Sequence, residues 1–278
     1  MTTVAVVGAG VIGLSWARLF VEHGLTVRIT DPRPDLADVV PDGVLVATSV
    51  AEAVRDADFV QENGPENLEF KKTLFAELIE EAPKHALLLS SSSAIPSSAF
   101  TEGIDGSRVL IGHPFNPPHV IPLVEVVPGE QTSEESVTKA VGFYRSLGRT
   151  PVVERKEIPG FVGNRLQAAL SREAAYLVEQ GVVTPEDLDA VVTNSLGLRW
   201  ATVGPFLGAH LGGGPGGYRH LATHIGKSMQ GLALGIPSQD PERLIKAVED
   251  AYGSSTYSAL AETRDRKQLA VLTALEEN

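Results

Sequence analysis

The sequence predicts an α/β protein with a doubly wound, mostly parallel sheet over residues 1–158 and a smaller all-α domain over residues 159–278. Through the first half, apolar β-branched runs alternate with helical periods. A glycine-rich turn follows the first of these runs directly. From Pro159 onward the strand signals fade and long amphipathic periods replace them, so Pro159-Gly160 is the natural hinge between the two domains.

Eight runs have the apolar, β-branched character of buried strands, and helical periods separate several of them. The strands are expected at 3–7, 26–30, 43–47, 58–61, 86–90, 108–112, 122–127 and 151–154. The helices between them are expected at 11–23, 49–56, 66–82 and 133–147, the last opened by Ser133 with two glutamates in its first turn. The second domain is expected to hold helices at about 162–180, 184–194, 215–229, 240–252 and 256–276.

Composition narrows the function classes. The chain has 278 residues, a formal net charge of −12 and no cysteine. Without a run of lysines and arginines, neither a nucleic acid nor an anionic membrane is an expected partner, and a small molecule is the better candidate. The missing cysteines exclude disulfides, thiol catalysis and cysteine-ligated metal. The N-terminal apolar run is too short for a signal peptide and no segment is long enough to span a bilayer, so we expect a cytoplasmic protein.

The first chemical motif is GAGVIG, which supplies Gly8, Gly10 and Gly13 directly after the strand at 3–7. Gly8 permits a tight turn, Gly10 lets a phosphate approach the backbone, and Gly13 lets the following helix lie close to the sheet. The positive end of that helix can then hold a pyrophosphate. A glycine-rich turn with no ligand is the alternative, but the position after a first strand favours a dinucleotide-binding (Rossmann) domain.

Asp31 indicates which dinucleotide binds. It ends the second predicted strand, where an acidic side chain accepts hydrogen bonds from the adenosine ribose hydroxyls. A carboxylate there repels a 2′-phosphate, so NAD is favoured over NADP. Arg33, two residues later, is the one nearby cation that would favour NADP instead.

A histidine and a glutamate suggest the chemistry. His113 lies in IGHPFNPP, at the end of a strand, and Glu125 interrupts the apolar strand PLVEVV. A short connection would place these two strands side by side. A carboxylate bonded to one imidazole nitrogen fixes the tautomer and makes the other nitrogen a general base. The alternative is a capping histidine in a proline-rich loop and a solvent-facing glutamate.

These segments, and others along the chain, resemble the L-3-hydroxyacyl-CoA dehydrogenase family. The further segments are DADFVQENGPENLEFKKTLF, LLSSSSAIP, PGFVGNRL, GLRWATVGPF, GGGPGG and TRDRKQLAVLTAL, which together cover essentially the whole chain. The later ones are most similar to the L-carnitine, L-gulonate and lambda-crystallin branch. The resemblance implies a dinucleotide-binding domain followed by a helical dimerisation domain, and hence a homodimer through residues 159–278.

Site residues follow from the same resemblance. It implies that His113 is the catalytic base, that Glu125 orients it, and that Ser93 and Asn164 hold the substrate oxygen. Asn116, in the loop of His113, would help to fix the substrate. Four further residues are expected in the cofactor site beside the glycines and Asp31: Val11, Ile12, Glu62 and Lys71.

The segment after Asp31 bears on the substrate. The acyl-CoA enzymes of the resembled family have a long basic helical hairpin between the second and third strands. This chain connects those strands with the short segment PRPDLADVVPDG, which holds one arginine. CoA carries three phosphate groups and favours a positive surface, which this acidic chain lacks. We therefore expect a small free 3-hydroxy acid, carnitine-like or gulonate-like, with a 3-hydroxyacyl-CoA thioester as the alternative.

The second domain should add selectivity. Arg199 and Trp200, in LRWA, match the substrate wall of the branch, where a guanidinium could clamp a carboxylate; the alternative is a solvated arginine. GGGPGGYRHL is expected either as a rim over the cleft or as an interhelical turn. The histidines at 210, 220 and 224 have no acidic partner at metal-ligand spacing, so no metal is expected.

The sequence thus predicts an NAD-dependent oxidoreductase that moves a hydride between the nicotinamide and a secondary alcohol. A non-catalytic crystallin-like or NAD-sensing protein is the alternative from another class, and the intact set of Ser93, His113, Glu125 and Asn164 argues against it. A β-hydroxyacid dehydrogenase or imine reductase would use a lysine on the first interdomain helix, and residues 160–172 contain none.

Overall fold

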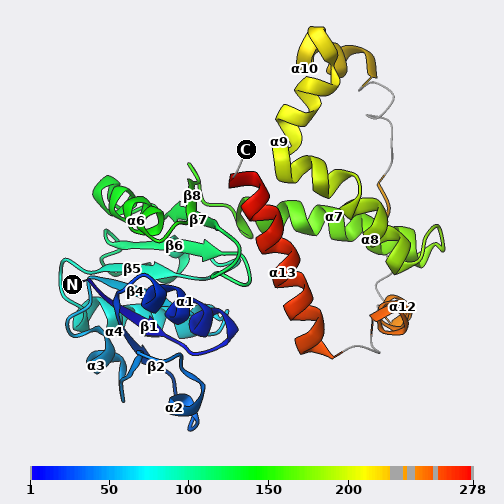
Figure 1. Ribbon diagram of the computed structural model, residues 1–278. Helices are drawn as coiled ribbons and strands as arrows, with labels where there is room; N and C mark the ends of the chain where they lie inside the picture. The colour runs from blue at the N-terminus through cyan, green and yellow to red at the C-terminus, as the bar shows by residue number, and fades with distance from the viewer. Residues whose placement is uncertain (1, 226–233, 237–241, 253–255, 277–278) are drawn as a thin grey trace. The chain divides into compact units, whose positions relative to one another are not determined.

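A computed structural model describes residues 2–225, 234–236, 242–252 and 256–276 (Figure 1). The chain divides into two compact units, Met1–Arg165 and Leu166–Asn278. Contacts extend the first unit past residue 158, the end of the domain expected from the sequence, because Phe161 is buried in the core of that unit and Gly163 bonds to one of its strands.

The first unit is built on one eight-stranded sheet, and the order of its strands is β3-β2-β1-β4-β5-β6-β7-β8. All neighbouring strands are parallel except β6 and β7, which run antiparallel. The predicted doubly wound sheet is confirmed. The strands are β1 Thr3–Val7, β2 Thr26–Thr30, β3 Leu45–Val46, β4 Phe59–Glu62, β5 Leu87–Ser90, β6 Val109–Pro114, β7 Leu123–Pro128 and β8 Thr150–Val153.

The helices of this unit begin where capping residues stand. Ser49, Asn67 and Ser133 each accept a hydrogen bond from an amide in the first turn of the helix that follows. Two helices, α2 and α5, have only four residues each, which is too short for a helical periodicity to be recognised in the sequence. The helices are α1 Val11–Glu22, α2 Leu36–Val39, α3 Val50–Val54, α4 Leu68–Glu81, α5 Ser97–Phe100 and α6 Glu134–Ser146.

Two hydrophobic clusters cover the two faces of the sheet. Trp16 and Phe20 of α1 pack with Phe143 and Tyr144 of α6 on one face. Helices α3, α4 and α5 cover the other face, where Phe75 stacks on Phe100. Because both faces are buried, the strands read as continuous apolar runs. The carboxyl ends of β1, β2 and β4 remain open to a ligand.

The described part of the second unit is helical. The helix expected at 215–229 is replaced by short turns up to Ile225, and its remainder lies outside the described residues. A helix that the sequence did not predict, α9, is kinked at Gly204 and Pro205, which interrupt its period. The elements are α7 Phe161–Glu179, which begins in the first unit, α8 Pro185–Thr193, α9 Leu196–Gly212, η1 Gly214–Gly216, α10 Gly217–His220, η2 Leu221–Ile225, α12 Glu242–Tyr252 and α13 Tyr257–Glu276.

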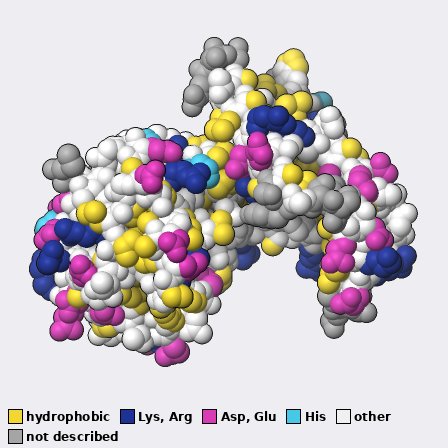
Figure 2. Space-filling view, turned by 60° about the horizontal axis from the view of Figure 1, so that its bottom comes forward, with side chains coloured by type: hydrophobic (Ala, Val, Ile, Leu, Met, Phe, Trp, Pro, Cys, Tyr) yellow, Lys and Arg dark blue, Asp and Glu magenta, His cyan; other side chains and the backbone are white. Residues whose placement is uncertain are grey.

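On the described residues of the face in Figure 2, basic side chains are interspersed with acidic ones and form no continuous positive patch. Among the residues that the structure describes, no helix is both long enough and apolar enough to cross a membrane.

Candidate active site

His113 and Glu125 face each other across the antiparallel pair of β6 and β7. They stand directly opposite in register, so their side chains project from the same face of the sheet. His113 Nδ1 lies 2.7 Å from Glu125 Oε2. Both residues are buried, with 5% and 3% of their surface exposed. The structure therefore brings together the pair that the sequence spacing predicts.

Glu125 stays ionised in this buried position. Burial opposes its charge, but hydrogen bonds from His113 and from the backbone N–H of Gly163 outweigh burial and hold the pKa of the carboxyl below its usual range. An ionised carboxylate accepts hydrogen bonds only, so Nδ1 of His113 carries the hydrogen. Nε2 is then the basic nitrogen, available to accept a proton from a ligand.

Aromatic rings and a glycine hold the imidazole in place. The ring centroids of Phe115 and Phe161 lie 5.4 and 5.5 Å from that of His113. A Cβ on Gly163 would lie 2.3 Å from Cζ of Phe115. Glycine is therefore needed at this position for the beginning of α7 to approach the imidazole and for its amide to reach Glu125.

Asn164 joins the serine-rich loop after β5 to this site. Its Nδ2 donates to the carbonyl oxygen of Ser93 at 2.9 Å, and its neighbour Gly163 donates to Glu125 at 2.7 Å. Ser93 is half-buried. Asn116 is exposed in the loop after β6, where its peptide bond to Pro117 is cis. Four of the predicted residues, His113, Glu125, Ser93 and Asn164, are thus linked by contacts through the first turn of α7.

Glu66 is a site residue that the sequence reasoning missed. Its Oε1 accepts hydrogen bonds from Ser92 Oγ at 2.7 Å, from Ala94 N at 2.9 Å and from Ile95 N at 3.1 Å, which fixes the loop around Ser93. Burial opposes its charge, but these hydrogen bonds prevail and the pKa of Glu66 lies below its usual range. Nothing in the spacing links Glu66 to a loop so far along the chain.

The glycine-rich turn has the geometry of a phosphate cradle. Gly8 has a φ of 99°. A Cβ on Gly13 would lie 1.9 Å from the carbonyl oxygen of Gly8, whereas one on Gly10 would meet nothing within 4 Å. Helix α1 begins without a side-chain cap, so its first amides are left to a ligand. Val11, at the start of α1, is 63% exposed, and Ile12 follows it half-buried.

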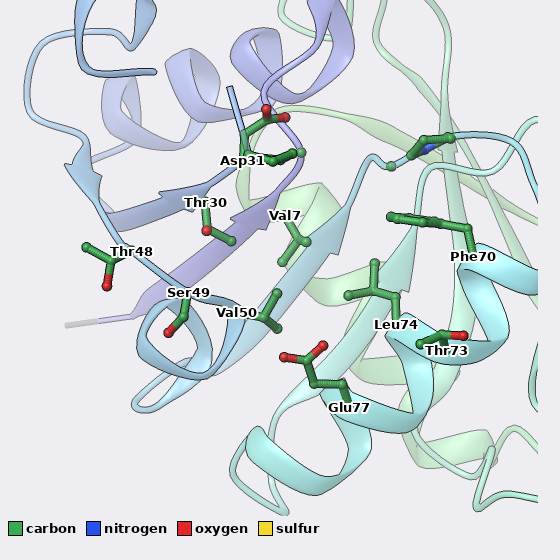
Figure 3. Close-up of a pocket in the computed structure, with 14 residues that line it drawn as sticks. Val7, Thr30, Asp31, Thr48, Ser49, Val50, Phe70, Thr73, Leu74 and Glu77 are labelled. Carbon is green, nitrogen blue, oxygen red and sulfur yellow. The ribbon is translucent and has the colours of Figure 1, made fainter. Parts of the chain in front are cut away.

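A cavity of about 510 Å³ opens beside this turn. Asp31 lies at its edge, where its Oδ2 accepts from the N–H of Ala9 at 2.7 Å and its Oδ1 from that of Arg33 at 2.9 Å. The carboxylate of Asp35 holds the Arg33 guanidinium at 2.7 Å. These residues fit the adenosine half of NAD. The cavity lies between β2, the start of α3 and α4 (Figure 3), and its lining includes Val7, Thr30, Thr48, Ser49, Val50, Phe70, Thr73, Leu74 and Glu77.

Glu62 and Lys71, which were expected in the cofactor site, do not line the cofactor cavity in the structure. Their side chains are 0% and 1% exposed and form an ion pair, with Lys71 Nζ 2.9 Å from both carboxylate oxygens. The Glu62 carboxylate also accepts hydrogen bonds from Ser90 Oγ and from the N–H of Gly64. Each charge is satisfied by the other inside the protein. The pair fixes the ends of β4 and β5 beneath the cofactor cavity and presents no side chain to it.

Arg199 and Trp200 lie on α9 in the second unit, and both are exposed. GGGPGG forms a 3-10 turn that continues into α10, with Tyr218 N–H donating to His210 Nδ1 at 3.2 Å. A contact of Arg199 or Trp200 with the substrate stays a prediction.

Comparison with known proteins gives consistent similarities. A family model described as 3-hydroxyacyl-CoA dehydrogenase, NAD binding domain, matches residues 3–45 and 37–158, and the C-terminal domain of the same description matches residues 160–235. A 3-hydroxyacyl-CoA dehydrogenase of Gibberella moniliformis is 42% identical, over 98% of this chain and 94% of that protein. An L-carnitine dehydrogenase of Streptomyces coelicolor is 39% identical, over 98% and 94%.

A solved structure is similar over the whole length. The crystal structure of 5-formyl-3-hydroxy-2-methylpyridine 4-carboxylic acid 5-dehydrogenase, an NAD+ dependent dismutase, superimposes with a TM-score of 0.79. The two chains are 28% identical, and the match covers 99% of each.

Proposed function

This chain belongs to the 3-hydroxyacyl-CoA dehydrogenase family and is an NAD-dependent dehydrogenase, and we propose that it oxidises the secondary alcohol of a small free 3-hydroxy acid. The acid is of the carnitine or gulonate type, and its carboxylate is free rather than joined to CoA. We further propose that the dehydrogenase acts in the cytoplasm.

The connection between β2 and β3 carries this proposal. It holds one short helix, α2, and its single arginine, Arg33, is already paired with Asp35. A CoA tail would need several cations for its phosphates. This connection therefore offers neither the length nor the free charge of the basic hairpin in the acyl-CoA enzymes.

Most of the similar curated relatives support a free acid as the substrate. Several that are 36–39% identical over nearly the whole chain are L-carnitine dehydrogenases. The protein of the similar solved structure is a dehydrogenase of a pyridine carboxylic acid. The relative from Gibberella moniliformis, at 42% identity, is called a 3-hydroxyacyl-CoA dehydrogenase, so a thioester remains the second candidate.

The residues of the site suggest how each would act. Bound NAD supplies the hydride acceptor. His113 Nε2 accepts the proton of the substrate hydroxyl, and the ionised Glu125 stabilises the imidazolium that forms. Ser93 and Asn164 hydrogen-bond the substrate oxygen, and Asn116 and the second unit's Arg199 and Trp200 bind the rest of the acid. In the reverse reduction, the imidazolium returns the proton.

A substrate panel tests the proposal. NADH formation is measured by absorbance with L-carnitine, L-gulonate, simple 3-hydroxy acids and 3-hydroxybutyryl-CoA, each with NAD. We expect turnover with a free acid and none with the thioester. Turnover with 3-hydroxybutyryl-CoA alone would contradict the argument from the β2–β3 connection and favour the second candidate.

Cofactor choice gives a separate prediction. Asp31→Ala should weaken NAD binding by about tenfold or more, because hydrogen bonds to a charged acceptor are lost. The ratio of NAD affinity to NADP affinity should also be smaller in the variant, because the repulsion of a 2′-phosphate disappears. Calorimetric titration with both cofactors measures the two effects, and Asp42→Ala, an exposed aspartate of the same connection, is the control. A wild-type protein that prefers NADP would show that this role of Asp31 is wrong.

We also propose a homodimer formed through the second unit. Its described helices leave large apolar side chains exposed, and such a surface is typical of an interface. They include Leu166, Val191, Leu198, Phe206 and Leu211. We expect a dimer in sedimentation velocity at micromolar concentration, whereas a monomer there would contradict the proposal.

A further inference from the structure

A second buried glutamate touches the dyad from β8. Glu154 directly follows β8, the strand that pairs with β7, and its amide donates to the carbonyl oxygen of Val126 at 3.0 Å. It is only 7% exposed. Its carboxyl group lies beside that of Glu125, within reach of a hydrogen bond if one of the two groups carries a proton. Two buried carboxyl groups therefore lie on the Nδ1 side of His113: Glu125 contacts the imidazole, and Glu154 lies beside Glu125.

The two carboxyl groups also bind neighbouring amides at the start of α7. Glu154 Oε1 accepts from the N–H of Val162 at 2.8 Å, and Glu125 Oε1 accepts from that of Gly163 at 2.7 Å. Two carboxylates in hydrogen-bond contact cannot both be ionised without strong repulsion, and a hydrogen bond between them requires a proton. If the pair shares one proton, the position of that proton decides where the negative charge lies.

The donors around each group place that proton. Glu125 receives the imidazole N–H of His113 as well as a backbone N–H, whereas Glu154 receives a backbone N–H alone. The carboxyl group with more donors is the better place for the charge. We propose that Glu154 is a protonated positioning residue, which donates its O–H to Glu125 and keeps a single negative charge facing His113.

The expected titration agrees with this geometry. Burial raises the pKa of Glu154, the Val162 amide partly offsets it, and the neighbouring Glu125 raises it further. The titratable groups that act on Glu154 are Glu125 and His113, on the two strands β7 and β6. When Glu154 ionises at higher pH, it can no longer donate a hydrogen bond to Glu125, and the two carboxylates repel each other. This repulsion should displace Glu125 from Nδ1 of His113, and alkaline turnover should fall because the imidazole is no longer held in position.

The role of Glu154 rests on the proposed function, but its protonation is measured without a substrate. A buried carboxylic acid has an infrared carbonyl band distinct from that of a carboxylate. We expect this band at neutral pH in the wild-type protein, its loss in Glu154→Gln, and its retention in Glu157→Gln. Glu157 is the matched control, because it bonds Ser97 and Ser98 rather than the dyad. A band that persists in Glu154→Gln would overturn the proposal.

Kinetics then test the positioning role. Glu154→Leu should lower kcat by roughly tenfold with little change in KM, because Glu125 loses a donor. Glu154→Gln keeps a donor and should recover most of that loss, and the alkaline fall in turnover should vanish with the ionisable group. A folded Glu154→Leu with wild-type kcat and pH profile, or a Glu154→Gln as slow as Glu154→Leu, would overturn the role. If no panel substrate turns over, the proposed function fails, while the infrared result still decides the protonation.

Discussion

Replacing His113 with asparagine is expected to lower turnover by roughly 10²–10⁴-fold, the usual contribution of a positioned general base. Asparagine can still donate to Glu125, but it has no nitrogen that accepts a proton at neutral pH. The fold should survive, because the amide keeps the hydrogen bond that satisfies the buried carboxylate. Steady-state kinetics on the substrate found by the panel measure the loss, and calorimetric NAD titration should show nearly unchanged affinity.

The matched control for His113 is His85, an exposed histidine 3.3 Å from Asp58. His85→Asn also removes an imidazole paired with a carboxylate, but at a surface far from the dyad in the sheet, where we expect no effect on turnover. Wild-type turnover in His113→Asn would show that the buried histidine is structural, and the mechanism would have to be withdrawn.

The sheet could be predicted because its signals are local. Each strand is a short apolar run, and helices α3, α4 and α6 carry their own capping residues. Weaker local signals gave weaker predictions. The four-residue α2 and α5 have no period to detect, and Gly204 with Pro205 hides α9, because these residues ordinarily end a helix.

The site could be predicted only where a pattern within one segment implied a partner. A glutamate inside the apolar strand β7 requires compensation, and this led to His113. Glu66 and Glu154 act on loops and strands remote in the sequence, so no spacing rule reveals them. Glu62 and Lys71 were predicted at the cofactor site but form a buried ion pair instead, because charged residues near a cofactor motif can compensate each other's charge in the interior.

Glu125→Gln should lower turnover on the order of 10²-fold or more. The amide keeps the shape of the side chain, but its NH₂ can donate to Nδ1 and so select the tautomer in which Nε2 carries the hydrogen and is no longer basic. The variant also loses the charge that stabilises the imidazolium. The double variant with His113→Asn should lose much less than the product of the two single losses, because residues that act as a unit are not additive.

Stability gives an independent measure of the same charge. The pKa of Glu125 is lower in the folded protein than in an unfolded chain, so the ionised group contributes stability above the usual carboxyl range. That contribution is lost as the pH falls through the lowered pKa, because the folded protein must then take up the proton. The wild-type protein should therefore lose more thermal stability on acidification than Glu125→Gln, which has no group to titrate there. Equal losses in the two proteins, together with additive kinetic effects, would mean that Glu125 carries no charge that supports His113.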